Sequence, residues 1–435
     1  NDDVMAMDVN DNSTYLALWL CSAIQNSSLL ENAGDDDDKN EAESRLDFPL
    51  HLLPSPNNYR SFFANLPVFW SKSDLSYLQG SNFFLEQLQN RKEHWNNLYD
   101  EIITADPTFA NTSHDISPRR LFDWAKACVG TRTLSLETWT GDLKPMSTAF
   151  NVSALVPMVD MLNHCCRSNP STCDWGVKAN NDEFIVTVGP NGLNAGDEAF
   201  ISYGFNPNSY YLLNYGFALE DNTRHDGFSP DVAYLPVNNT NDIHKNNNHQ
   251  TTQTQWIKVS IGDLQIATRA LSTIRYAVFC NHTNNKDDCD LSSFVSPISI
   301  ENEKRTMNIL YESAKSALNQ YPTTLNEDRI RLEEKRCSNG EFVLKPFTKH
   351  RNAVLVQAGE KRVLLHWIQL SQACLLYLED IQRAHQEELE VAEEVNQKEE
   401  ETAQSVDHNL TFDIYCSLLE SQLKKVTPLP NFMNS

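Results

Sequence analysis

The sequence lacks any apolar run of 18 residues or more, so it contains no segment long enough to cross a bilayer as a helix. It also lacks an excess of basic residues, since 35 Lys and Arg stand against 59 Asp and Glu, for a net charge of −24. Nucleic-acid backbones are bound by clusters of Lys and Arg. We therefore expect no membrane and no nucleic-acid partner, whereas a basic protein would be attracted.

The ten cysteines are scattered, and they do not form the paired CxxC spacing of a structural zinc site. No secretory signal peptide opens the sequence either. Scattered cysteines in a chain of 435 residues are typical of reduced, buried thiols. We therefore predict an intracellular protein of two or three packed units, with cytoplasm, nucleus and plastid all compatible.

The first third of the chain has helical patterns. Hydrophobic residues recur at helical spacing over 12–30, which predicts a helix. The next segment, 31–44, is rich in Asp and Glu and has no apolar face, so we expect an acidic loop. Residues 117–134 predict a further helix, with Ser117 as its N-cap and Pro118 at its first position.

The middle of the chain changes to the alternation of strands. The segments EFIVTV (183–188) and EAFISYG (198–204) are strand-like, and Asn208 is placed to cap a short helix after them. Residues 238–255 are a polar, low-complexity linker and mark a domain boundary. Beyond the linker, helical periodicity predicts helices over 261–280, 301–319, 360–397 and 409–425.

The stretch VPMVDMLNHCCRSNPSTCDW (156–175) holds an Asn-His pair directly before two cysteines. Taken alone, the pair could belong to a metal site, a nucleophile with its base, a buried hydrogen-bonded pair or a cofactor cradle. Adjacent cysteines rarely ligate one ion, which disfavours zinc. The strand-turn-helix context of a nucleophile elbow is also missing. We therefore predict no metal, and structural roles for Cys165, Cys166 and Cys173.

Three motifs follow one another in this region: VPMVDMLNH, then AGDEAFISYG, then NSYYLLNYGF. In that order they resemble the SET-domain protein methyltransferases, in the branch of the Rubisco large-subunit lysine methyltransferase and its histidine-methylating relatives. The motifs of that branch read P-x-x-D-x-x-N-H, G-E/D-E-x-x-I-x-Y and Y-G-F. The matching residues are Pro157, Asp160, Asn163, His164, Gly196, Asp197, Glu198, Ile201, Tyr203, Tyr215, Gly216 and Phe217.

The resemblance implies an α+β fold, in which a SET-domain β core is interrupted by a helical insert and followed by an all-helical C-terminal domain. SET domains of this branch open with a glycine-bearing strand pair, and none precedes the first helix here. The resemblance therefore implies a SET region that lacks its N-terminal strands. The expected divisions are the insert at 1–149, the C-terminal half of the SET core at 150–237, the polar linker at 238–255 and a substrate-binding-like domain at 256–435.

The resemblance also implies S-adenosyl-L-methionine as the cofactor. Tyr203 would be the catalytic tyrosine, Asn163 would bond the methionine moiety, and His164 would contact the adenine through its backbone. Considered singly, the aromatic residues could be core residues, and the arginine of GTRTL could be a helix-end cation. The other implied cofactor-site residues are Arg132, Asp160, Tyr215 and Phe217.

The function that the resemblance implies is methyl transfer to a lysine side chain of a protein substrate, by a protein that we expect to be a monomer. Methyl transfer from a sulfonium is an in-line displacement with a neutral leaving group, so catalysis is largely a matter of alignment. Two alternatives stay open. One is a histidine-directed methyltransferase of the same branch, and the other is a non-catalytic SET-derived module that binds a protein.

Overall fold

The structure is a computed structural model, and its two compact units each have a hydrophobic core. Unit 1 comprises residues 1–75, 84–205 and 210–217, and unit 2 comprises residues 76–83, 206–209 and 218–435. The described residues are 11–31, 49–110, 116–138, 150–165, 172–177, 183–189, 192–220, 222, 232–238, 254–283, 291–333, 344–396 and 408–424.

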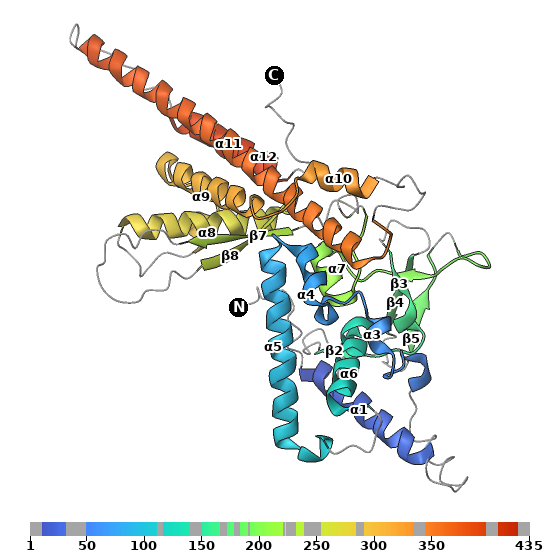
Figure 1. Cartoon of the computed structure of the whole chain (residues 1–435). Helices are drawn as coiled ribbons and strands as arrows, with labels where there is room; N and C mark the ends of the chain where they lie inside the picture. The colour runs from blue at the N-terminus through green and yellow to red at the C-terminus, as the bar shows by residue number, and fades with distance from the viewer. Residues whose placement is uncertain are drawn as a thin grey trace. The chain divides into compact units, whose positions relative to one another are not determined.

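Helix α6 (Pro118–Arg132) is the centre of unit 1 and leads directly into the candidate site. Pro118 begins it, because a proline at the first position loses no helical hydrogen bond. Ser117 holds the N-cap position without a side-chain hydrogen bond, and residues 121–129 are all buried. The other helical elements of this unit are α1 (Asp11–Glu31), η1 (Leu50–Leu52), α3 (Tyr59–Phe62), η2 (Pro67–Phe69), α4 (Lys72–Leu75), α5 (Asn82–Ala105), η4 (Pro107–Ala110), η5 (Val159–Met161) and α7 (Asn208–Tyr215), of which α5 and α7 begin with residues of unit 2 (Figure 1).

The described residues of unit 1 also form two small sheets. Strands β1 (Leu134–Thr138) and β2 (Phe150–Ala154) form an antiparallel pair. The second sheet has the order β3-β6-β4-β5, and its short strand β6 runs parallel to both β3 and β4. This topology places the Asn-His stretch beside the strand that precedes Tyr203. The bounds are β3 (Asn163–His164), β4 (Thr172–Val177), β5 (Phe184–Thr187) and β6 (Phe200–Ile201).

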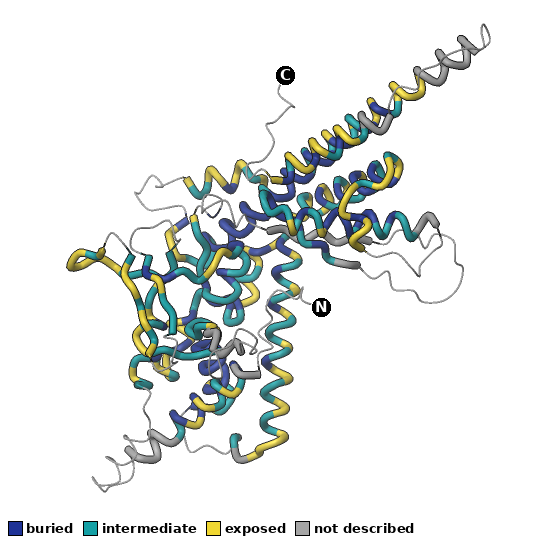
Figure 2. Tube along the Cα trace, turned by 180° about the vertical axis from the view of Figure 1, so that it is seen from behind, coloured by how far each residue is buried: buried dark blue, intermediate teal, exposed yellow. Residues whose placement is uncertain are grey.

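The described residues of unit 2 form a helical assembly with an antiparallel pair of strands, β7 (Val232–Asn238) and β8 (Thr254–Ser260). Its core includes the fully buried Trp367, whose indole N–H donates to the Ser260 carbonyl oxygen at 3.1 Å. Figure 2 shows the buried residues concentrated where the long helices of this unit converge. The helical elements are η3 (Ser76–Leu78), α8 (Leu264–Thr283), η6 (Leu291–Phe294), α9 (Ile300–Leu318), α10 (Leu325–Glu333), α11 (Lys349–Asn396) and α12 (His408–Leu423).

The predicted elements agree with the structure in type and differ at their ends. The α+β fold with short strands and a helical C-terminal region is confirmed, and the hairpin of β7 and β8 is an addition to the predicted helices. The strand expected over 198–204 is two residues long, and the helix expected from residue 360 begins at Lys349. The predicted domain divisions stay predictions. Residues 32–44 of the acidic loop and 239–253 of the linker lie outside the described residues.

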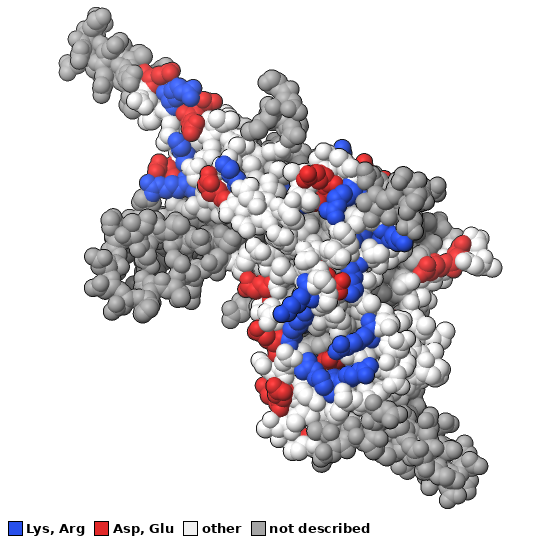
Figure 3. Space-filling view, in the orientation of Figure 1, with Lys and Arg blue, Asp and Glu red and all other residues white. Residues whose placement is uncertain are grey.

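Charge is unevenly distributed over the face of the molecule drawn in Figure 3, where basic side chains gather over α5 and α6. A pocket of about 320 Å³ in unit 1 is lined by the basic residues Arg60, Lys92 and Arg119 and by the acid Asp123. Arg119 donates to the Asp123 carboxylate at 2.9 Å, and burial raises the pKa of that carboxyl. The net acidity of the chain therefore does not describe every surface. Among the described helices, none is both long and apolar enough to traverse a membrane.

Candidate functional site

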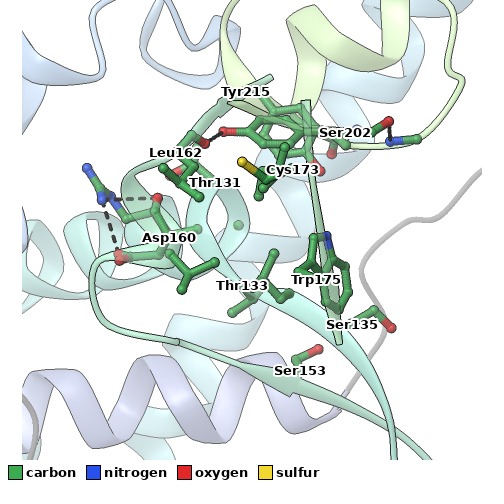
Figure 4. A pocket seen from close by; sticks show the side chains of 18 of the residues that line it. Thr131, Thr133, Ser135, Ser153, Asp160, Leu162, Cys173, Trp175, Ser202 and Tyr215 are labelled. Atoms are coloured by element: carbon green, nitrogen blue, oxygen red, sulfur yellow. Dashed lines mark hydrogen bonds and ion pairs between the residues drawn. The ribbon is translucent and has the colours of Figure 1, made fainter. Parts of the chain in front are cut away.

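The candidate site is a pocket of about 620 Å³ in unit 1, a volume within the usual range for cofactor sites. It is bounded by the end of α6, the two small sheets, the η5 turn and residues of α7. Figure 4 shows Asp160, Leu162, Cys173, Trp175 and Tyr215 around it. The remaining residues of its wall are Gly130, Thr131, Arg132, Thr133, Leu134, Ser135, Ser153, Val159, Thr172, Asp174, Ile201, Ser202, Tyr203, Gly204, Phe205, Tyr210 and Asn214.

Strand pairing brings the first two sequence motifs together at this pocket. Asn163 is paired with Phe200, and His164 is paired with Ile201, in the parallel register of β3 and β6. A side-chain contact reinforces the pairing, because the Asn163 amide donates to the Glu198 carboxylate at 2.6 Å. The two motifs are therefore fixed to one another by backbone and side-chain bonds.

Two hydrogen bonds hold Tyr203 at the pocket, one made by its side chain and one by its backbone. Its phenol donates to the carbonyl oxygen of Leu162 at 2.7 Å, and its backbone N–H donates to Nδ1 of His164 at 2.9 Å. Burial is the main reason that the pKa of Tyr203 is raised to about 12, and the nearby Asp160 carboxylate adds to the rise. The phenol therefore stays protonated at neutral pH and can act as a hydrogen-bond donor, not as a base.

Arg132 and Asp160 form an ion pair in the pocket wall. The distance from Nη1 of Arg132 to Oδ2 of Asp160 is 3.1 Å, and the same nitrogen lies 3.4 Å from the Asp160 carbonyl oxygen, contacts drawn as dashed lines in Figure 4. The second carboxylate oxygen, Oδ1 of Asp160, is buried and has no hydrogen-bond partner among the described residues. A buried acceptor without a partner is costly unless a ligand supplies a donor. The pair therefore offers an acceptor and a guanidinium to a zwitterionic ligand.

A cluster of aromatic rings packs against Tyr203. The ring centroids of Tyr203 and Tyr215 are 4.7 Å apart, and those of His164 and Phe217 are 5.9 Å apart. Tyr211, which is 2% exposed, stacks on Phe217 at 5.2 Å and donates from its hydroxyl to the Gly204 carbonyl oxygen at 2.6 Å. The third motif therefore contributes three wall residues, Tyr210, Asn214 and Tyr215, and a packed support for the second motif.

Gly216 has a steric reason to be glycine in this motif. Its φ is +81°, a conformation that other residues rarely adopt, and an added Cβ would lie 3.1 Å from the Asn65 carbonyl carbon and from the Leu66 nitrogen. The positive φ of Gly216 turns the chain at the end of α7 toward Phe217. Asn214 of the same helix lines the pocket and accepts a hydrogen bond from Arg91 at 2.7 Å.

The structure brings the predicted site residues into one region, but only some of them line the pocket. Arg132, Asp160, Tyr203 and Tyr215 are in the pocket wall, whereas Asn163, His164 and Phe217 are not among its lining residues. Their predicted roles stay predictions. The sequence interpretation missed the Leu162 carbonyl, which has no residue-type signal, and Tyr211, whose spacing of four residues from Tyr215 could have indicated a shared helix face.

A metal site in the Asn-His stretch would use its cysteines, and the structure describes only some of these. Cys165 and Cys173 are free thiols, and Cys166 lies outside the described residues. Within the part of the chain that the structure describes, no group of three or more His, Cys, Asp or Glu side chains is arranged to hold a metal ion.

Comparison with solved structures identifies the class of fold. A crystal structure of the SET domain of LSMT bound to MeLysine and AdoHcy matches with a TM-score of 0.55 and 20% identity, over 85% of this chain and 76% of that one. The structure of Rubisco LSMT bound to AdoMet matches with a TM-score of 0.52 and 19% identity, over 85% and 81%. The fold is therefore SET-like, with a helical region at its C-terminal side.

Comparison with sequences identifies the branch. The family described as Rubisco LSMT substrate-binding matches residues 243–364. The ribulose-1,5 bisphosphate carboxylase/oxygenase large subunit N-methyltransferase of Nicotiana tabacum is 25% identical over 386 residues, or 83% of this chain and 69% of that enzyme. The human actin-histidine N-methyltransferase is 22% identical over 353 residues, or 74% of this chain and 55% of that enzyme. The chain is a distant homologue of the Rubisco LSMT-like branch of SET-domain methyltransferases, which includes the actin-histidine enzymes.

Proposed function

We propose that the chain is an S-adenosyl-L-methionine-dependent protein methyltransferase that acts on a lysine side chain of a protein substrate. The observation that carries the proposal is Tyr203, whose phenol meets the Leu162 carbonyl at 2.7 Å in the wall of a pocket of cofactor size. The homology supports the reaction class, because the tobacco relative is named an N-methyltransferase of a protein subunit.

The residues of the pocket fit the amino-acid end of this cofactor. Its carboxylate would accept hydrogen bonds from the Arg132 guanidinium, a donor suited to bidentate contact. Its ammonium would donate to Oδ1 of Asp160, which is buried without a partner among the described residues. The predicted contact of Asn163 with the methionine moiety belongs to the same proposal, although its side chain is exposed and bonded to Glu198.

The residues of this chain would act by positioning. When bound, S-adenosylmethionine supplies an electrophilic methyl group on a sulfonium. The carbonyl oxygen of Leu162 carries a partial negative charge that attracts positive charge at the acceptor end of the pocket. Tyr203, protonated because burial raises its pKa to about 12, orients that carbonyl and the acceptor nitrogen through its hydroxyl group. In this arrangement Tyr203 does not have to act as a general base.

The acceptor is the point at which the relatives differ. The tobacco relative is named for a Rubisco subunit, and the human relative is named for a histidine of actin. The human match supports histidine as the alternative acceptor. We also propose that residues 256–435 act as the domain that binds the protein substrate, because the substrate-binding family matches 243–364.

Calorimetric titration of S-adenosylmethionine tests the cofactor site. We expect binding to the parent chain and to Tyr203→Phe, and weakened binding to Asn163→Ala and Arg132→Leu. Tyr15→Phe is the matched control, because Tyr15 is 70% exposed and lies outside the pocket. In a transfer assay with lysine-bearing and histidine-bearing peptides, Tyr203→Phe should lower the rate by about 10²-fold or more.

The outcomes separate the three candidate functions. Transfer to lysine peptides supports the main proposal, and transfer to histidine peptides only supports the alternative acceptor. If the folded parent binds the cofactor without transfer to any peptide or protein tested, a binding module is favoured. Absence of cofactor binding to folded parent protein contradicts the enzyme proposal for this chain.

A further inference from the structure

Unit 1 contains another cavity, of about 320 Å³, which shares no lining residue with the methyl-transfer pocket. Its volume is at the lower end of the range for ligand sites, so it suits one small molecule or one side chain. Figure 3 shows basic side chains gathered over α5 and α6, the helices of Lys92 and Arg119. We call this cavity the basic pocket, and its lining residues are Arg60, Val68, Phe69, Trp70, Lys92, Trp95, Asn96, Arg119 and Asp123.

The basic pocket has an excess of positive charge. Three cations, Arg60, Lys92 and Arg119, line it together with one carboxylate, Asp123, which leaves two net positive charges. The Asp123 carboxylate accepts a hydrogen bond from Nε of Arg119 at 2.9 Å and also attracts Arg60, so two guanidinium groups share its single charge. Among the described residues, no other carboxylate lines the pocket or forms an ion pair with one of its three cations.

Lys92 is the cation of the pocket that lacks a counter-charge. Its side chain is half-buried, and it makes no hydrogen bond or ion pair with any residue that the structure describes. Burial lowers the pKa of its ammonium group, because the group loses water and no carboxylate compensates for the loss. An anion bound in the pocket would supply the missing partner.

Neutral groups hold the two arginine side chains. Nε of Arg60 donates to the Tyr59 hydroxyl at 3.2 Å, and the guanidinium carbon of Arg119 lies 5.1 Å from the centre of the Tyr99 ring. These contacts orient the guanidinium groups without removing their charge. The terminal nitrogens of both arginines make no hydrogen bond within the described part of the chain. The pocket therefore offers charged donors from two guanidinium groups and one ammonium.

We propose that the basic pocket binds a phosphate monoester. This group has a charge of about −1.5 to −2 near neutral pH and three terminal oxygens that accept strong hydrogen bonds. It therefore matches the two net positive charges and the three cationic donors better than a carboxylate, which carries one charge on two oxygens. The rings of Phe69 and Trp95, 6.3 Å apart, give the pocket an apolar side that suits an aromatic carrier of the phosphate.

Calorimetric titration of the full chain with phenyl phosphate tests the proposal. We expect saturable binding that weakens as salt is added, because salt screens partly exposed charges. Benzoate, an aromatic anion with one charge, should bind about tenfold more weakly or worse, and phenol should not bind. Equal affinity for benzoate and phenyl phosphate, or no binding of phenyl phosphate to the folded chain, overturns the proposal.

Matched variants locate the binding. Lys92→Gln should weaken phenyl phosphate binding by about tenfold or more, and it leaves no partner unpaired, so the fold should be retained. Lys72→Gln, an exposed change on α4 outside the pocket, should leave the affinity unaltered. Arg60→Gln should also weaken binding, whereas Arg120→Gln, exposed on α6, should not. Unaltered affinity in folded Lys92→Gln or Arg60→Gln contradicts the assignment.

A tyrosine-phosphorylated peptide distinguishes two sources of the phosphate. If the peptide displaces phenyl phosphate and binds more tightly, the pocket recognises a modified side chain of a protein. If it binds more weakly, the pocket recognises a small phosphate compound. Both results support the phosphate site.

Cofactor titration of the same variants separates this inference from the proposed function. The affinity for S-adenosylmethionine should be the same in the parent chain and in Lys92→Gln, because the two pockets have no lining residue in common. Phosphate binding in a chain that does not bind S-adenosylmethionine would contradict the proposed function alone. Normal cofactor binding and methyl transfer without phosphate binding would contradict the basic-pocket assignment alone.

Discussion

His164 and Tyr203 are joined by a hydrogen bond from the Tyr203 backbone N–H to Nδ1 of His164, at 2.9 Å. Because Nδ1 accepts this bond, that nitrogen carries no proton. The imidazole thus sets the backbone position from which the Tyr203 phenol reaches the Leu162 carbonyl. The histidine of the first motif acts on the tyrosine of the second through its side chain, in addition to any backbone contact that it makes with a cofactor.

Replacement of His164 by Leu should therefore disturb the position of Tyr203, although His164 itself does not line the pocket. The variant leaves the Tyr203 backbone N–H without this acceptor, which should lower the free energy of unfolding by about 1–3 kcal/mol. Methyl-transfer rate should fall while S-adenosylmethionine affinity changes less, a difference that calorimetry and a transfer assay would show. A His164→Leu variant with normal stability and rate would contradict the positioning role.

Gly216 and Gly130 make a matched pair of glycine substitutions. Gly216→Ala should be destabilising by about 1–3 kcal/mol, because the residue has positive φ and its Cβ would press on the backbone of Asn65 and Leu66. Gly130 lies within α6, and apart from the helix itself no heavy atom of the described residues lies within 4 Å of an added Cβ. Gly130→Ala should therefore be neutral or stabilising by up to about 1 kcal/mol. Urea denaturation of both variants measures the difference. Equal effects would show that the motif glycine has no steric role.

The order of the motifs indicated that the predicted residues lie close together, whereas the geometry of their side chains could not be predicted from the sequence. Arg132, Asp160, Tyr203 and Tyr215 all line one pocket, and the roles predicted for them stay predictions. The Leu162 carbonyl could not be predicted, because every residue has one and only the fold directs it. Helix α11 begins before Gly359, a residue type that weakens an isolated helix, because packing of buried residues on both sides outweighs the local preference.

Arg275 and Glu303 form a buried ion pair in unit 2, with exposed side-chain fractions of 1% and 0%. The guanidinium meets both carboxylate oxygens, at 2.7 and 2.8 Å, and also donates to the Val295 carbonyl oxygen at 2.8 Å. Arg275→Leu leaves the carboxylate buried without this partner and should cost about 3–5 kcal/mol of unfolding free energy.

The control for this prediction is the exposed pair of Arg305 and Glu301 on α9, 2.7 Å apart with exposed fractions of 41% and 62%. Arg305→Leu should change stability by less than about 1 kcal/mol, because solvent screens a surface pair. Guanidinium titration of both variants compares the two. Similar losses in both would mean that burial does not govern the contribution of the Arg275 pair.

His366 should make the stability of unit 2 sensitive to mild acid. The residue is 2% exposed, its Nδ1 has no hydrogen-bond partner among the described residues, and burial lowers its pKa to about 4 from the usual 6.5. Between these two values the unfolded chain binds a proton that the folded chain does not. The contribution of His366 is therefore fully present above pH 6.5 and is lost as the pH falls toward 4, by up to about 3 kcal/mol.

His366→Leu removes this titration and nothing else that ionises. The variant should lose less stability than the parent chain between pH 7 and about pH 4.5, whatever its stability at neutral pH, because all carboxylates are common to both. Urea denaturation at each pH, compared as the difference between the two proteins, isolates the histidine. Parallel pH profiles for parent and His366→Leu would show that the imidazole is protonated in the folded chain as readily as in the unfolded one.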